Sequence, residues 1–246
     1  GVSGNPTLAG VVATTGAPGV VQLGSHVRER LKANRTYYVR TDGSDSNNGL
    51  TDSAGGAFLT IQKAINTIAS LDLSTFTVFV FVRSGTYTGG VTVNGRFFGS
   101  GSVILIGDTT TPSNVVISTT SVHAVQVLNG GRIAVLGFKL TTSGGASSAL
   151  ACINQSMLEF GSVEFGSVTA NHIYAIYQST ITCEGIGNYT VSGDAAYHIQ
   201  AERSGVVNIS QTTVTLSGSR SFTTTAHASS LSLIRAENVT FSGSAT

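Results

Sequence analysis

Few side chains in this sequence could act as a general acid or base. Beyond residue 130 the acidic side chains are Glu159, Glu164, Glu184, Asp194, Glu202 and Glu237. Glycosidases need two carboxylates, about 5 to 9.5 Å apart, and in the register of the sequence repeat no two of these carboxylates share a column on adjacent copies. The only plausible acid–base cluster is Glu202, with Arg203 beside it and His227 one repeat further on. Glu202 and His227 are therefore the candidates for acid–base catalysis, a solvated salt bridge is the alternative, and we assign no catalytic residue.

A second set of polar residues recurs once per repeat and could bind a sugar chain. Amides, a phenol ring, a carboxylate and an imidazole can hydrogen-bond to sugar hydroxyls or stack on sugar rings. The members of this column are Asn129, Asn154, Tyr177, Glu202 and His227. A stacked ladder of turns without any ligand would show the same pattern. The column is the candidate glycan-binding site, and both interpretations stay open.

A polar loop near the N-terminus carries oxygen ligands at close spacing. Asp42, Ser44, Asp45, Asn47 and Gly49 would suit a hard cation, but their spacing does not match an EF-hand loop. Short polar side chains in such loops also hydrogen-bond to the local backbone. We therefore assign no metal site, with Asp42 and Asp45 as the candidates for one.

The two cysteines, Cys152 and Cys183, lie at apolar positions of the repeat. Buried free cysteine behaves as a small hydrophobic residue, and no paired-cysteine or paired-histidine spacing indicates zinc. We expect two buried free thiols and no cofactor.

These candidates depend on a regular sequence repeat in the second half of the chain. Thr190-Val191-Ser192-Gly193 returns as Thr215-Leu216-Ser217-Gly218 and as Thr240-Phe241-Ser242-Gly243, in steps of 25. The same register aligns Val135, Phe160, Cys183, Asn208 and Leu233, and it aligns the apolar residues Leu128, Ile153, Ile176, Ala201 and Ala226. An apolar column beside a polar one is typical of stacked parallel strands, in which alternate side chains face opposite sides.

The repeats favour an all-β parallel β-helix. No repeat contains a helical pattern, which excludes βα barrels and doubly wound sheets. The chain has 30 glycines and only 10% charged residues, a composition that suits short strands and turns. From residue 76 onward we expect roughly seven coils, each hydrogen-bonded to the next.

In the N-terminal part of the chain, the sequence predicts a connector, a helix that caps the β-helix, and the first strands. Residues 1–36 form the expected connector, with a short helix from His26 to Asn34, and residues 37–246 form the β-helix domain. An apolar stripe over residues 60–70 predicts an amphipathic helix that caps the first coil. Residues 77–82 form a continuous apolar run, typical of a strand that is buried on both faces.

Charge and hydropathy exclude two classes of partner. The net charge is +1 without any cluster of Lys or Arg, so we expect no nucleic acid. No apolar run is long enough to cross a bilayer, so we expect no membrane span, and residues 1–25 lack the pattern of a signal peptide. Because the chain starts at Gly1 and stops inside a repeat at Thr246, we expect a fragment or processed product, or a second subunit over the C-terminal end.

Three segments, residues 38–49, 58–65 and 82–87, resemble the opening of right-handed parallel β-helix proteins of the pectate-lyase-like group. Within that group they are most similar to phage tail-spike and tail-fibre proteins. Residues 19–23 are also similar to a short repeat of phage tail fibres.

This resemblance implies a homotrimeric virion spike, exposed to the extracellular medium, that binds a polysaccharide of the host surface. Residues 1–36 would then contact other tail or head proteins of the virion. Lyases of the group hold calcium with clustered acidic residues and use Arg or Lys as the base, and no matching set exists here. We therefore expect a binding and structural role. The alternatives are a polysaccharide depolymerase, either glycoside hydrolase or lyase, with its site between subunits, and a bacterial adhesin.

Overall fold

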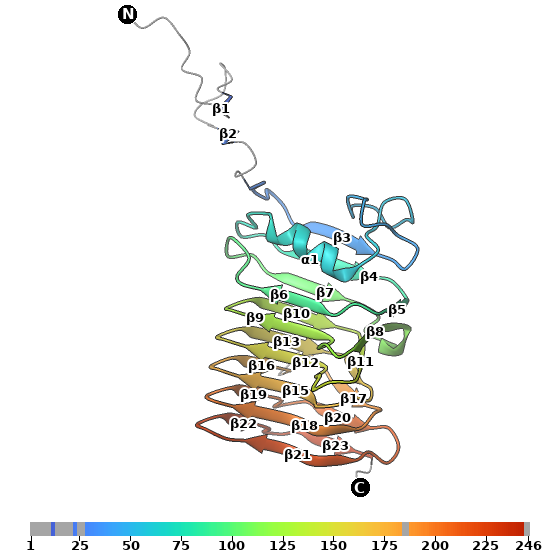
Figure 1. Ribbon diagram of the computed structural model, residues 1–246, viewed down its shortest axis with the longest axis vertical. Coiled ribbons are helices and arrows are strands. Elements are labelled where there is room, and N and C mark those ends of the chain that lie inside the picture. Colours follow the sequence, from blue (N-terminus) through green and yellow to red (C-terminus); the bar gives the residue numbers. More distant parts are fainter. Residues whose placement is uncertain (1–10, 13–21, 24–27, 184–186, 244–246) are drawn as a thin grey trace, which may run out of the picture.

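The computed structural model describes residues 11–12, 22–23, 28–183 and 187–243. Three parallel sheets wind into a single β-helix, whose coils stack along one axis (Figure 1). Each coil passes through sheet 1, sheet 2 and sheet 3 in turn. The all-β parallel β-helix predicted from the repeats is confirmed.

The strands are short and distribute evenly over the three sheets. Sheet 1 contains β3 (Arg35–Val39), β4 (Val78–Val82), β7 (Val103–Ile106), β10 (Arg132–Leu136), β13 (Met157–Gly161), β16 (Thr180–Thr182), β19 (Val206–Asn208) and β22 (Leu233–Arg235). Sheet 2 contains β5 (Gly85–Tyr87), β8 (Val115–Thr120), β11 (Lys139–Ser143), β14 (Glu164–Phe165), β17 (Tyr189–Val191), β20 (Thr213–Leu216) and β23 (Thr240–Ser242). Sheet 3 contains β6 (Val91–Asn94), β9 (Val125–Leu128), β12 (Leu150–Ile153), β15 (Asn171–Ile176), β18 (Ala195–Glu202) and β21 (Phe222–Ala228). From β4 to β21 this makes six complete coils, and β22 and β23 begin a seventh.

Two smaller elements lie outside the three sheets. A 3-10 helix, η2 (Pro112–Asn114), directly precedes β8. Near the N-terminus β1 (Val11–Val12) and β2 (Gln22–Leu23) form an antiparallel pair.

Helix α1 (Ile61–Ala69) covers the N-terminal end of the shaft, as the apolar stripe predicts. Thr60 is its N-cap and accepts a hydrogen bond from the Lys63 amide, a favourable start for a helix. The stripe residues Ile61, Ala64, Ile65 and Ile68 are buried. The helix lies against β6, β3 and β4 (Figure 1), so it shields apolar side chains of the first coil from water.

The segment before β3 contacts the first coil rather than forming a helix. Arg30 forms a β-bridge with Asp72, and the Leu31 amide donates to the Asp72 carbonyl at 2.8 Å. The side chain of Leu31 is buried. The helix predicted from His26 to Asn34 is therefore wrong over residues 28–34, because tertiary pairing overrides local propensity. Residues 26 and 27 lie outside the described residues.

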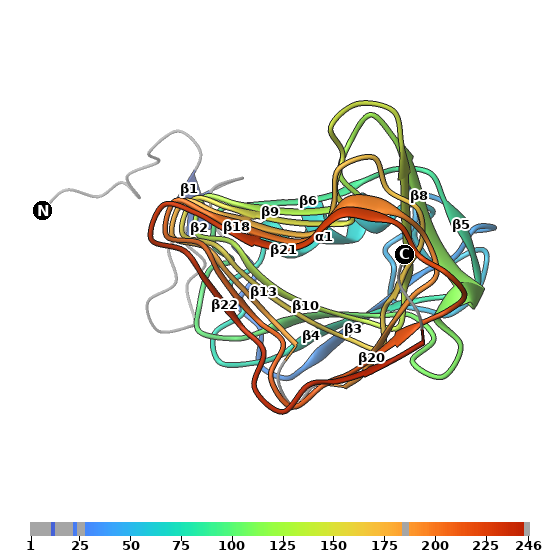
Figure 2. The same cartoon turned by 90° about the horizontal axis from the view of Figure 1, so that it is seen from below.

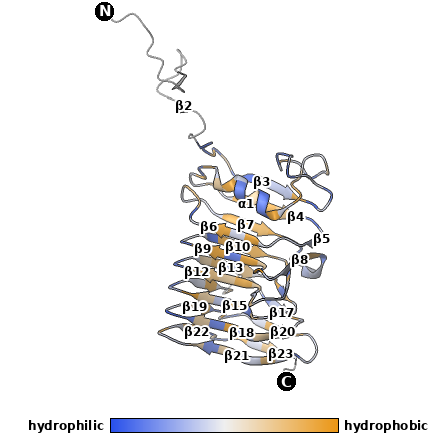
Figure 3. Ribbon diagram, in the orientation of Figure 1, coloured by the Kyte–Doolittle hydropathy of each residue, from blue (hydrophilic) through white to orange (hydrophobic). Residues whose placement is uncertain are grey.

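The outer face of sheet 1 is apolar in its N-terminal half. Strand β4 alternates between buried and half-buried residues, so the prediction of burial on both faces is wrong for the single chain. Its half-buried residues, Phe79 and Phe81, continue into the half-buried Ile104 and Ile106 of β7 and Ala134 and Leu136 of β10. The hydropathy colouring shows the apolar character of these strands (Figure 3). A contiguous apolar surface of this kind is typical of a protein interface.

The length of the coils is not constant, and this corrects the predicted register. Val135 pairs with Phe160, as expected, but Asn208 pairs with Thr182 and Leu233 with Val206. In sheet 2, Thr190 pairs with Thr215 as predicted, whereas Thr240 pairs with Thr213. The fixed repeat step therefore fails beyond Cys183, where the coils become longer by one or two positions.

Candidate functional site

A sharp corner between sheet 3 and sheet 1 repeats in successive coils of the shaft (Figure 2). Two adjacent residues with positive φ make the corner in five coils: Asn129 and Gly130, Asn154 and Gln155, Tyr177 and Gln178, Arg203 and Ser204, and Ser230 and Leu231. Backbone hydrogen bonds stack these corners, for example from the Gly130 amide to the Asn154 carbonyl at 2.9 Å. Side chains at the corner therefore form columns along the axis, with one interstrand step of ~4.8 Å between coils.

Three of the five predicted column residues share this corner, and two do not. Asn129, Asn154 and Tyr177 directly follow Leu128, Ile153 and Ile176, which pair in register. Ile176, however, pairs with Glu202, so Arg203 occupies the next corner position. His227 pairs with Gln200 and lies within sheet 3. The predicted column is wrong for Glu202 and His227 because the last coils are longer than the repeat step.

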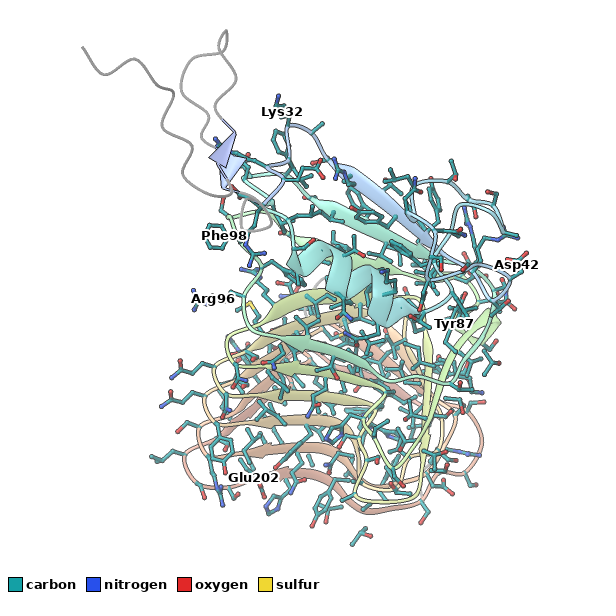
Figure 4. All side chains as sticks on the ribbon, turned by 45° about the horizontal axis from the view of Figure 1, so that its top comes forward. Lys32, Asp42, Tyr87, Arg96, Phe98 and Glu202 are labelled. Carbon is teal, nitrogen blue, oxygen red and sulfur yellow. The ribbon has the colours of Figure 1, made fainter. Side chains whose placement is uncertain are left out.

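An open groove of about 600 Å³ runs along this corner. Its lining is Arg96, Asn129, Gly130, Asn154, Gln155, Tyr177, Gln178 and Arg203. None of these residues is acidic, and the Tyr177 ring is their largest apolar group. They come from successive coils, so the groove runs parallel to the axis of the shaft. Figure 4 shows Arg96 toward the N-terminal end of this flank and Glu202 toward the other.

Amide side chains form hydrogen-bonded ladders inside the groove. Asn129 Nδ2 donates to Asn94 Oδ1 at 2.8 Å, and Asn154 Nδ2 donates to Asn129 Oδ1 at 3.0 Å. Gln155 Nε2 donates to Gln178 Oε1 at 3.2 Å. Each amide has more donor and acceptor positions than the ladder uses. The ladder therefore fixes the side chains and leaves polar atoms available to a ligand.

Tyr177 and Arg203 form the C-terminal part of the groove. The Arg203 guanidinium lies 5.0 Å from the centre of the Tyr177 ring, and it donates a hydrogen bond to the Tyr177 hydroxyl. Tyr177 is 42% exposed. Sequence reasoning missed Arg203 because of the register error, and it missed Arg96 because the first corner lies before the regular repeats.

A second groove, of about 500 Å³, adjoins the first along the outer edge of sheet 1. The two grooves share Arg96, Gly130 and Gln155. Arg132 and Glu159 line the second groove and form an ion pair at 3.0 Å. The polar corner thus continues into the edge of the apolar face on sheet 1.

The catalytic candidates do not form an acid–base pair. Tyr174 donates its hydroxyl to Glu202 at 3.2 Å, and Gln200 donates to the same carboxylate at 3.0 Å. His227 lies against the ring of Tyr197, with 5.8 Å between ring centres. Within the described residues, neither a hydrogen bond nor an ion pair joins Glu202 to His227.

The metal candidates have protein partners instead. Asp42 forms an ion pair with Arg40 at 2.8 Å, and the guanidinium holds the pKa of the Asp42 carboxyl below its usual value. Asp45 accepts hydrogen bonds from the amides of Leu59 and Thr60 and from the Thr60 hydroxyl, at 3.0, 2.9 and 2.7 Å. Across residues 28–183 and 187–243, no group of three or more His, Cys, Asp or Glu side chains could hold a metal ion. Asp45 therefore links the polar loop to the start of α1.

Replacing Asp45 with Ala should destabilise the N-terminal cap. The substitution leaves two backbone amides and one hydroxyl without their acceptor, so we expect a loss of about 1–2 kcal/mol in the free energy of unfolding. Chemical denaturation followed by circular dichroism measures the change. Asp42→Ala is the matched control, because an exposed ion pair contributes at most about 1 kcal/mol. Equal stabilities of the Asp45 variant and the wild type would contradict this role.

Two buried histidines form a hydrogen-bonded chain inside the shaft. Tyr189 Oη lies 2.9 Å from His198 Nε2, His198 Nδ1 lies 3.1 Å from His172 Nδ1, and His172 Nε2 lies 3.0 Å from the Gly166 carbonyl. A carbonyl only accepts, so His172 Nε2 donates to it, and the other hydrogens follow. His198 Nδ1 donates to His172, and the Tyr189 hydroxyl donates to His198. With both imidazoles neutral, every nitrogen in this chain has a hydrogen-bond partner.

Burial lowers the pKa of both histidines. The pKa of His172 falls to about 4 because desolvation disfavours the charged form. Burial and the neighbouring His172 also hold the pKa of His198 well below its usual value. Sequence reasoning missed this contact, since a repeat step of 25 does not align residues 172 and 198.

The cysteines are buried and free, as the sequence predicts. Burial raises the pKa of the thiols of Cys152 and Cys183 to about 12. In the part of the chain that the structure describes, no helix is long and apolar enough to cross a membrane.

Comparison with known proteins gives one structural likeness. No protein-family model matches the chain, and no curated protein matches it. Among solved structures, the chain is similar to the deglycosylated pectin methylesterase from Aspergillus niger. That likeness has 13% sequence identity and a TM-score of 0.47, and it covers 86% of this chain and 89% of the other. The parallel pairing of the strands, rather than this likeness, establishes the β-helix fold of the present chain.

Proposed function

We propose that the protein is a spike or fibre subunit of a virion, which attaches to a polysaccharide of the host surface. The resemblance of residues 37–110 to phage tail-spike and tail-fibre proteins supports the virion context. The corner groove supports the binding role. In this proposal residues 1–36 contact other virion proteins, and the shaft points into the extracellular medium.

The observation that carries the binding role is the groove of about 600 Å³ with its ladders of amides and one exposed aromatic ring. Amide groups match the hydroxyls of a sugar, and the face of Tyr177 offers a surface for stacking. A rigid solenoid holds these groups in place before the ligand arrives, which reduces the entropy cost of binding.

The groove favours binding over cleavage. A glycosidase needs two carboxylates on either side of the bond, and the lining of the corner groove contains none. The second groove contains one, Glu159, which pairs with Arg132. A depolymerase would therefore need a further carboxylate from a neighbouring subunit. Incubation with host polysaccharide and assay of new reducing ends or unsaturated products tests for it, and cleavage that Glu159→Gln abolishes would overturn the binding-only function.

A homotrimer is part of the same proposal, and the apolar outer face of sheet 1 supports it. Phe79, Phe81, Ile104, Ile106 and Leu136 lie on its outer face, although their strand pattern is typical of burial on both sides. A neighbouring subunit would supply the missing layer. The corner groove would then lie along the rim of the subunit interface, since the second groove joins it to this face.

Replacing Tyr177 with Asn should weaken binding to host polysaccharide about tenfold, a change typical of a central aromatic contact. Asparagine accepts the positive φ of 55° that this corner requires, and Asn154 already occupies the same position one coil away. The variant therefore removes the ring without disturbing the turn. Isothermal titration calorimetry with purified host glycan measures the change.

Tyr197→Asn is the matched control, because Tyr197 lies on sheet 3 outside the groove. Unchanged affinity of the Tyr177 variant, or equal loss in both variants, would contradict the assignment of the groove.

A further inference from the structure

We infer that the corner groove takes an acidic polysaccharide, a chain with carboxylate groups that lies parallel to the shaft and is held by Arg96 and Arg203. This inference rests on the proposed function and adds the chemical class and the direction of the ligand. Its support is the charge of the lining, the lack of carboxylate partners for two arginines, and the backbone conformation at the corner.

The two arginines of the groove differ from most others in the shaft. Most described arginines pair with a carboxylate of the protein: Arg30, Arg35, Arg40, Arg83, Arg132, Arg220 and Arg235. Among the described residues, Arg96 and Arg203 have no carboxylate within ion-pair distance. The Arg203 guanidinium contacts the uncharged ring and hydroxyl of Tyr177. Both guanidinium groups therefore keep donors available for a carboxylate, which they match in two-point geometry.

The lining of the groove has a positive charge without compensation. Two arginines and no acidic residue contribute to it, although the whole chain has a net charge of only +1. A groove with charge of one sign raises the local concentration of ligands with the opposite charge. Two separate cations among amides match a chain with a charge on some of its units. They do not match the continuous phosphate backbone of a nucleic acid, which requires a basic cluster.

The spacing of the arginines sets the direction of the ligand. Arg96 follows β6 and Arg203 follows β18, with the corners of β9, β12 and β15 between them. Four interstrand steps of ~4.8 Å put them ~19 Å apart along the axis. Between them lie the amide ladder and the ring of Tyr177. A bound chain would thus contact an arginine at each end and uncharged polar groups in the middle.

Tyr177 and Arg203 occupy corner positions with an unusual backbone conformation. Both residues have positive φ, 55° and 47°, a conformation that only Gly, Asn and Asp adopt readily. The equivalent corners at residues 129 and 154 use Asn, and the last corner uses Ser230. Side chains that occupy a strained backbone conformation are concentrated at functional sites. The corner thus has an aromatic ring and a guanidinium where a turn alone would favour Asn.

The test compares acidic and neutral forms of the same glycans on the full chain. The probes are hyaluronan, alginate and a panel of bacterial capsular polysaccharides that contain uronic acids, each in native form and with its carboxyl groups reduced to alcohols. Binding is measured by biolayer interferometry at low and high salt. We expect the native acidic form of at least one probe to bind tenfold or more tightly than its reduced form, and we expect salt to weaken only the acidic form.

The variant Arg96→Gln with Arg203→Asn should remove this preference, with about a tenfold loss for each arginine on the acidic forms. Asn at residue 203 keeps the corner conformation. The control is Arg30→Gln with Lys32→Gln, which removes the same charge from the N-terminal end of the shaft, where Figure 4 places Lys32. The control should keep the preference. Circular dichroism verifies that both double variants are folded.

Three outcomes would overturn the inference. The first two leave the proposed function in place, and the third replaces it. Equal affinity for acidic and reduced glycans would reject the acidic ligand alone. Equal loss in the groove variant and the control would reject Arg96 and Arg203 as the contacts. Tighter binding of single-stranded DNA than of any glycan, sensitive to the same arginines, would assign the groove to nucleic acid. If the protein binds none of the glycans, in either form, the proposed function itself would be rejected.

Discussion

Acidification from pH 6.5 to pH 4.5 should lower the melting temperature of this protein, and the buried pair His172 and His198 should account for most of the loss. Both imidazoles are neutral in the fold, and burial lowers the pKa of each. In the unfolded chain both have a pKa near 6.5. Below pH 6.5 the unfolded state therefore binds more protons than the folded state, so stability decreases as the pH falls and is fully present above that value.

The size of the loss in stability follows from the pKa shift of His172. The pKa of His172 falls from 6.5 to about 4, and each unit corresponds to about 1.4 kcal/mol. His172 alone thus contributes about 2 kcal/mol between these two pH values, and a protein of this size would lose roughly 4–8 °C in melting temperature. Protonation of both rings would also place two donors against each other at the 3.1 Å contact. Thermal unfolding, followed by circular dichroism at each pH, measures the slope.

The matched variants isolate this pair. His172→Asn with His198→Asn should flatten the dependence of melting temperature on pH between 6.5 and 4.5, even where the variant is less stable overall. His227→Asn, in β21 of the last complete coil, should keep the slope of the wild type. His123 also has a pKa lowered by burial, but it is present in all variants and cancels in the comparison. An unchanged slope in the double variant would refute this explanation.

The carboxylates change the stability mainly at lower pH, so they contribute little to the slope between pH 6.5 and 4.5. Asp42, Asp52, Asp108 and Glu237 have their pKa values lowered by hydrogen bonds to arginines or to local backbone and amide groups. Their stabilisation is present above the unfolded pKa values, near 3.8 to 4.5, and is lost only as the pH falls below them. The window from 6.5 to 4.5 therefore belongs mainly to the histidines.

The sequence predicts the fold well because the fold depends on local patterns. The apolar stripe from Ile61 to Ala69 specifies α1, since residues three and four apart lie on one face of a helix. The alternation in each repeat specifies strands, and the stacking of repeats leaves a β-helix as the solution. Neither inference requires the exact length of a coil.

The candidate site is harder to predict because it depends on that length. A slip of one residue moves a side chain from one face of a strand to the other, and the coils become longer after Cys183. Asn129, Asn154 and Tyr177 precede the change, so the predicted column places them correctly. Glu202 takes the place of Arg203 in that column. The apolar residue that should follow Cys183 in its column is the buried Ile209 rather than Asn208, and that choice would have given the longer step.

Replacing Ile106 with Asp should convert the proposed trimer into a folded monomer. Ile106 lies on the outer face of β7, between Phe81 of β4 and Leu136 of β10. In the trimer this face would be covered by another subunit, and a carboxylate there would be buried without a partner in three copies at once. In the monomer the same carboxylate lies in water at little cost, so the β-helix itself should survive.

Light scattering measures the outcome directly. We expect the wild type to have three times the mass of one chain, which is 25.2 kDa, and the Ile106 variant to have the mass of a single chain, with unchanged circular dichroism. Ser118→Asp is the control, because it adds the same charge to the outer face of β8 in sheet 2 and should leave the trimer intact. A monomeric wild type would refute the trimer, whereas a trimeric Ile106 variant would place its interface on another face. Monomers that still bind glycan would show that the corner groove is complete within one chain.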